Sequence, residues 1–98
     1  MTTPNVAAFE AKLARQGYQV ATKSMEPSLV LDDHTHDVEI LGLVTAGDIK
    51  ITVDGKARRY GVGEEFTMDL GQLHSELVGP EGVSFVVGRR ACEDNGGS

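Results

Sequence analysis

The chain has no tryptophan, a single cysteine and only 5% aromatic residues, and these shortages exclude several classes of protein. One cysteine, Cys92, can form no internal disulfide, which excludes the disulfide-stapled scaffolds of small secreted proteins. No apolar run approaches the length of a membrane-spanning helix, and the first residues lack the basic and apolar regions of a secretory signal. We therefore expect a cytoplasmic protein with no membrane partner.

A basic surface of the kind that binds nucleic acid is also missing. The net charge is -6, and the acids are spread along the chain and do not form one block. Arg58-Arg59 and Arg89-Arg90 are the only basic pairs, and such pairs are typical of solvated strand ends. The composition therefore predicts no nucleic-acid partner.

The length and the turn residues predict one small β domain. The chain has 98 residues, twelve of them glycine, with many short alternating runs of Val, Ile and Leu. Strands are expected over residues 18–23, 28–31, 38–46, 49–53, 56–60, 66–68, 74–78 and 83–88. Turns are expected at Gly47-Asp48, Asp54-Gly55 and residues 79–82. Because closing the sheet on itself removes exposed edges, we predict a small antiparallel barrel.

A short helix is predicted before the strands. Thr3 can cap its first N–H groups, Pro4 suits its first position, and Gly17 supplies a left-handed end, which places the helix at roughly residues 4–16. The predicted organisation is therefore a helix segment, 1–17, packed on the outside of a barrel that spans 18–91. Residues 92–98 are rich in Gly, Ser and acids and are expected to be disordered.

The three histidines indicate a metal site. His34 and His36 precede one long apolar run, and His74 begins another predicted strand, so these two segments contain every histidine of the chain. Imidazole is the commonest ligand for transition metals in proteins, and three of them leave coordination positions open. The donor set suits a divalent Zn, Fe, Mn, Ni or Cu ion and does not choose among them. Alone, each histidine is more typical of a surface or core residue.

The two segments resemble the paired motifs of the cupin superfamily, over residues 28–88. His34, His36 and Gly47 fit the first motif. Gly63, Gly71 and His74 fit the second, in which Asp69 replaces a proline and Val78 an asparagine. The resemblance implies an all-β, jelly-roll type barrel with His34, His36 and His74 as metal ligands. A degenerate cupin that binds no metal is the alternative.

Two glutamates need separate treatment. The cupin motif implies a glutamate ligand at position 40, where this chain has Ile40, and Glu39 lies one residue early. Since a shift of one residue reverses the face of a strand, Glu39 should point outward unless a bulge turns it back. Glu76 follows His74 by two residues and shares its face, about 7 Å further along the strand. It is a candidate catalytic base, and a solvated surface acid is an equally good reading.

The remaining expectations concern the cavity, the partner and the reaction. Alternation places Phe66, Met68, Val44, Ile51 and Tyr60 toward a small, mostly apolar interior. Leu41 and Leu43 lie on the opposite face. Because a chain this short has only one helix with which to cover that face, we expect a homodimer. Two functions fit such a site: a metal-dependent oxygenase or isomerase of a small polar molecule, and a non-catalytic module that senses or binds a small ligand or a metal.

Overall fold

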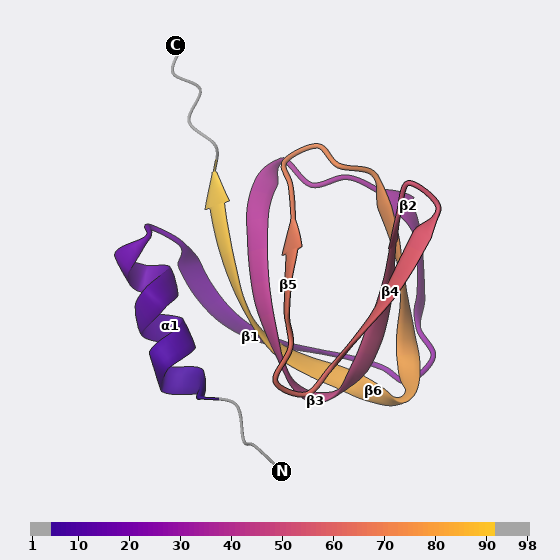
Figure 1. Ribbon diagram of the computed structural model, residues 1–98, viewed down its shortest axis with the longest axis horizontal. Coiled ribbons are helices and arrows are strands. Elements are labelled where there is room, and N and C mark those ends of the chain that lie inside the picture. The colour runs from indigo at the N-terminus through magenta and orange to yellow at the C-terminus, as the bar shows by residue number, and fades with distance from the viewer. Residues whose placement is uncertain (1–4, 92–98) are drawn as a thin grey trace.

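The structure of the protein is a computed structural model that describes residues 5–91 (Figure 1). Within these residues, one helix and six strands follow one another. They are α1 (Val6–Arg15), β1 (Gln19–Met25), β2 (Val30–His34), β3 (Val38–Val53), β4 (Lys56–Gly61), β5 (Glu65–Met68) and β6 (His74–Ala91). The six strands belong to one antiparallel sheet, and α1 lies outside it. The prediction of a mainly antiparallel β protein with one short N-terminal helix is confirmed.

Helix α1 begins one residue after Asn5, whose side chain accepts a hydrogen bond from the backbone N–H of Ala8 at 3.0 Å. Asn5 is therefore the N-cap, and the helix begins two residues after the predicted start at roughly residue 4. Thr3 and Pro4 lie outside the described residues. The predicted left-handed end is confirmed, since Gly17 has a φ of 83°. Within residues 5–91, no helix is long and apolar enough to cross a membrane.

The sheet is organised around its two long strands. β3 and β6 pair along most of their lengths, from Val38 opposite Ala91 to Val53 opposite His74. β1 and β2 flank β6, whereas β4 and β5 flank β3, and the strands curve around an interior (Figure 1). Among residues 5–91, no hydrogen-bond ladder joins the β1–β2 side to the β4–β5 side. A barrel closed by hydrogen bonds therefore stays a prediction.

Two expected turns are instead bends within continuous strands. The Gly47-Asp48 pair lies inside β3, and residues 79–82 lie inside β6, so each long strand combines two predicted ones. The register shifts between Val44 and Ala46 and between Gly47 and Ile49. Bulges of this kind bend a strand without ending its pairing. The Asp54-Gly55 hairpin is confirmed, because both residues have the positive φ of its tight turn.

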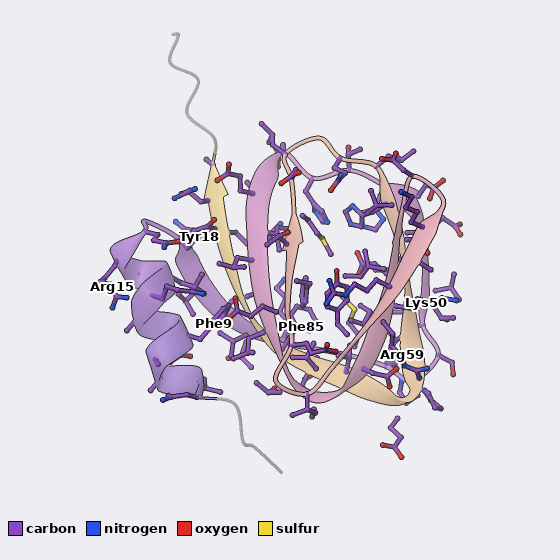
Figure 2. All side chains as sticks on the ribbon, in the orientation of Figure 1. Phe9, Arg15, Tyr18, Lys50, Arg59 and Phe85 are labelled. Carbon is purple, nitrogen blue, oxygen red and sulfur yellow. The ribbon has the colours of Figure 1, made fainter. Side chains whose placement is uncertain are left out.

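Two apolar clusters lie on the two faces of the sheet. The inner cluster contains the predicted inward residues Phe66, Met68, Val44 and Ile51, and the half-buried Tyr60 packs against it. Figure 2 shows Phe85, another member of this cluster, within the space that the strands surround.

The outer cluster joins α1 to the sheet. Phe9 and Leu13 of the helix pack with Leu43 and Val86, and Leu41 packs against them (Figure 2 labels Phe9). Leu43 is only 5% exposed in the single chain. The helix therefore already covers the face that led us to expect a dimer, and the homodimer stays a prediction.

The bend of β3 depends on Gly47, and this dependence is testable. Gly47 has a φ of 69°, and a Cβ added there would overlap the backbone carbonyl of Gly82. Gly47→Ala should lower the free energy of unfolding by about 3 kcal/mol or more, because backbone displacement adds to left-handed strain. Urea unfolding measures the loss.

The matched control is Gly55→Ala. Gly55 has a φ of 76° but no atom within 4 Å of the added Cβ. Gly55→Ala should therefore lower the free energy of unfolding by only about 1 kcal/mol, the cost of the left-handed backbone conformation. Equal losses for the two variants would show that the contact with Gly82 does not hold the bend.

Candidate metal centre

The pairing of β2 with the first half of β6 brings the histidines together. His34 ends β2 and lies opposite His74, the first residue of β6. His36 lies in the short connection that leads from β2 into β3. Glu76 is two residues beyond His74 on β6, opposite Leu31. Segments forty residues apart in the chain therefore supply one cluster.

The four side chains form a compact donor set. One ligand atom from each of His34, His36, His74 and Glu76 can be chosen so that all four lie within 4.8 Å of one another. The Oε2 atom of Glu76 is 3.2 Å from His34 Nε2 and 3.1 Å from His74 Nε2. Glu76 is 6% exposed and His74 1%. This burial contradicts the reading of Glu76 as a solvated surface acid.

Backbone carbonyls fix the orientation of two imidazoles. His34 Nδ1 donates to the carbonyl oxygen of Asp32 at 2.7 Å, and His74 Nδ1 donates to that of Gln72 at 3.1 Å. A carbonyl oxygen can only accept a hydrogen bond, so both Nδ1 atoms carry a proton. In a neutral imidazole the Nε2 atom then carries a free lone pair. The same arrangement orients metal-ligating histidines in general.

The donor set fits a metal ion. Two neutral Nε2 lone pairs that face one carboxylate oxygen repel it, unless a proton or a metal cation lies between them. Ligand atoms about 2.1 Å from one ion are about 2.9–3.4 Å apart at angles between octahedral and tetrahedral. The observed 3.1 and 3.2 Å separations fall in that range. All four ligand atoms lie within 4.8 Å of one another, compared with the about 4.2 Å that two opposite ligands span, so the cluster could hold one ion.

The environment keeps His36 neutral. Its pKa is lowered from the ordinary 6.5, first by burial and then by the positive charges that His74 and His34 can take up. Glu76 raises the pKa of His36 and Arg89 lowers it, both by smaller amounts. Since only a neutral imidazole can ligate a metal, His36 is ready for ligation at neutral pH.

Glu39 is not part of the cluster. Its carboxylate accepts two hydrogen bonds from the Arg90 guanidinium, at 3.0 Å from Nε and 2.6 Å from Nη2. The next residue, Ile40, lines the cavity beside the histidines. Glu39 therefore points away from the cluster of histidines and Glu76, as strand alternation predicted.

A cavity of about 130 Å³ adjoins the centre. Phe66 and Met68 line it as expected, whereas Val44, Ile51 and Tyr60 do not. Most of its wall was not predicted from the sequence, and this part consists of Lys23, Met25, Leu31, Ile40, Ile49, Phe85, Val87 and Arg89. Alternation along residues 85, 87 and 89 was the available signal, but it does not tell which face turns inward.

The lowered pKa of His36 predicts how stability depends on pH in the metal-free protein. Between the folded-state pKa and 6.5, the unfolded chain binds more protons at this residue than the folded chain does. His36 therefore does not reduce the free energy of unfolding above pH 6.5. As the pH falls below 6.5, protonation of the unfolded chain at this residue lowers the free energy of unfolding. Urea unfolding at a series of pH values measures this loss.

His36→Asn serves as the comparison, because other groups also titrate in this range. Its free energy of unfolding should fall less steeply below pH 6.5 than that of the wild type. Parallel curves for the two proteins would contradict the lowered pKa.

The described fold is similar to several solved structures of low sequence identity. An RmlC-like cupin from Shewanella frigidimarina matches with a TM-score of 0.66 at 15% identity, over 80% of this chain and 69% of that one. The DMSP lyase DddQ from Ruegeria pomeroyi matches at 0.68 and 20% identity, over 80% of this chain and 40% of the lyase. The polyketide cyclase RemF from Streptomyces resistomycificus matches at 0.66 and 20%, over 81% of this chain and 60% of the cyclase.

This chain thus spans less than two thirds of the length of either enzyme. No protein-family model and no curated protein matches the amino-acid sequence. Several of the structural matches are themselves described as cupins. Residues 5–91 therefore form a small domain with the cupin fold.

Proposed function

We propose that this chain is a metal-dependent enzyme that moves a proton within a small molecule, an isomerase in the broad sense. One observation carries the proposal: two imidazoles with Nδ1 held on backbone carbonyls direct their Nε2 atoms at the same buried carboxylate oxygen. His34, His36, His74 and Glu76 would hold a divalent transition metal. When bound, such an ion would stabilise negative charge on a substrate oxygen.

Glu76 is suited to serve both the metal and the substrate. Its Oε2 atom faces the imidazoles, whereas Oε1 has no hydrogen-bond partner within residues 5–91. Glu76 also lines the cavity. Oε1 would therefore accept a proton from a substrate carbon and return it to another atom, so that the carboxylate ends in its starting state. Among the described residues that line this cavity, Glu76 is the only carboxylate.

The rival functions make different demands on the same residues. An oxygenase would need open coordination positions and no base, so Glu76 would act only as a ligand. A binding or sensing module would need neither turnover nor a base. The DMSP lyase and the polyketide cyclase share only the fold with this chain, but they are enzymes with that fold, and this supports the catalytic reading.

Metal uptake is the first prediction of this proposal. Protein purified without an affinity tag and stripped with chelator should take up about one equivalent of Zn²⁺ or Ni²⁺, measured by calorimetry and elemental analysis. His74→Ala should weaken binding by about a hundredfold or more, because it removes a ligand that is 1% exposed and held by a backbone carbonyl.

Glu39→Gln is the matched control for metal uptake. It changes a glutamate of the same chain that is bonded to Arg90 and lies away from the cluster. Its metal affinity should equal that of the wild type. No uptake by wild type, or equal weakening in Glu39→Gln and His74→Ala, would contradict the proposed centre.

Glu76→Gln separates a base from a mere ligand. The amide keeps the size and one ligating oxygen but cannot accept the proton, so metal-loaded Glu76→Gln should retain metal and lose turnover by about a hundredfold or more. The assay follows proton exchange between substrate carbon and deuterated water, by NMR, over a panel of keto acids, diols and thiols.

The other outcomes select a rival function. Glu76→Gln that retains both metal and turnover would favour an oxygenase. A wild type that binds panel members tightly but exchanges and transforms none of them would favour the binding module.

A further inference from the structure

The cavity beside the metal centre is lined by two cations. Lys23 on β1 and Arg89 on β6 both contribute to the wall of the about 130 Å³ cavity that His34, His36 and Glu76 also line. An exposed lysine or arginine is ordinary on a protein surface. Both side chains are exposed to solvent, and both border the apolar lining of this cavity.

Strand alternation separates Arg89 from its neighbour Arg90. Arg89 shares a face of β6 with Phe85 and Val87, which also line the cavity. Arg90 points to the opposite face, where it bonds the Glu39 carboxylate and lies 4.5 Å over the ring of Tyr18. Of this basic pair, Arg90 therefore packs on the outer face, whereas Arg89, although exposed, borders the cavity.

The β1–β6 register places Lys23 and Arg89 along one strip of the inner face. Lys23 lies opposite Phe85, and Gln19 lies opposite Arg89. The pair between them is Ala21 and Val87, whose short side chains leave room above them. Both long cationic side chains can therefore extend over the same strip.

The protein itself does not neutralise these two charges. Among residues 5–91, the Lys and Arg ion pairs are Lys12–Glu65, Arg59–Asp48 and Arg90–Glu39, and neither Lys23 nor Arg89 has an acidic partner. The acid that lines the cavity, Glu76, directs its Oε2 atom at two imidazoles instead.

The rest of the wall is apolar and the space is small. It is formed mainly by Met25, Leu31, Ile40, Ile49, Phe66, Met68, Phe85 and Val87. An apolar cavity of about 150 Å³ in another protein holds one benzene molecule, so this one suits a body of about five to seven heavy atoms. A surplus of positive charge beside such a wall favours a short apolar molecule with one negative charge.

We infer that the cavity binds a small monocarboxylate, with its carboxylate at Lys23 and Arg89, its short apolar body against the wall, and its reacting end toward the metal centre. This inference rests on the proposed function, because it names the substrate class of the same site. Arg89 can bind a carboxylate through two parallel N–H donors, and Lys23 adds a second charge.

Binding of isovalerate tests the inference. Calorimetry compares isovalerate with isovaleramide, which has the same shape without charge, and with isoamylammonium, which has the opposite charge. The metal-free and the Ni²⁺-loaded protein should both bind isovalerate about tenfold or more tighter than the amide, and isoamylammonium should not bind. Added salt should reduce the preference.

Lys23→Met and Arg89→Met should each weaken isovalerate binding about threefold to fivefold and leave the amide unchanged. Lys50→Met and Arg15→Met are matched controls, because Figure 2 shows both cations away from the interior that contains Phe85. These two variants should change the affinity for neither isovalerate nor isovaleramide.

Three results would overturn the inference. The first is equal affinity for isovalerate and isovaleramide, and the second is no binding of isovalerate at millimolar concentration. The third is binding that requires Ni²⁺ and is unchanged in Lys23→Met and Arg89→Met, which would place the carboxylate on the metal. Metal uptake is measured on the same samples. A preserved acid preference without metal uptake therefore contradicts only the proposed function, and metal uptake without the preference contradicts only this inference.

Discussion

Alternation of side chains along the paired strands β3 and β6 is the constraint on which the rest of the structure depends. Their ladder gives each strand one face toward the cavity and one toward α1. Ile40 and Glu39 are separated in this way on β3, and so are Arg89 and Arg90 on β6. A slip of one residue would exchange both pairs, bringing the Glu39–Arg90 ion pair inward and removing Arg89 from the cavity. Register therefore decides the charge of the site as well as its shape.

The same constraint explains which features were predictable from the sequence. The histidine cluster could be predicted because the two segments fit a known pair of motifs, and the outward position of Glu39 followed from parity alone. The bends at Gly47 and at residues 79–82 could not, because a glycine with positive φ looks the same in a bulge as in a turn. Lys23 was missed for a different reason: its place on the cavity wall depends on which strand pairs with β6, and the sequence does not state that.

Prediction from the sequence was limited in a similar way for the outer face of the sheet. The apolar face of Leu41 and Leu43 was predicted correctly, and so was a helix on the outside of the sheet, but pattern alone does not tell how much of that face the helix covers. In the structure, Leu13 of α1 is fully buried against that face and also meets Gly88 closely. The missing side chain at Gly88 allows this approach, so a glycine in a central strand was the signal for helix packing.

The charge of the cavity differs in sign from that of the whole chain, and this affects how an anion would reach it. The net charge of -6 repels anions at long range, but at physiological salt the field of exposed charges decays over about 8 Å. Lys23, Arg89 and a bound metal would dominate within that distance. The proposed carboxylate selectivity would therefore arise from short-range contacts in the cavity, without long-range steering, and should appear mainly as slow dissociation of the right ligand.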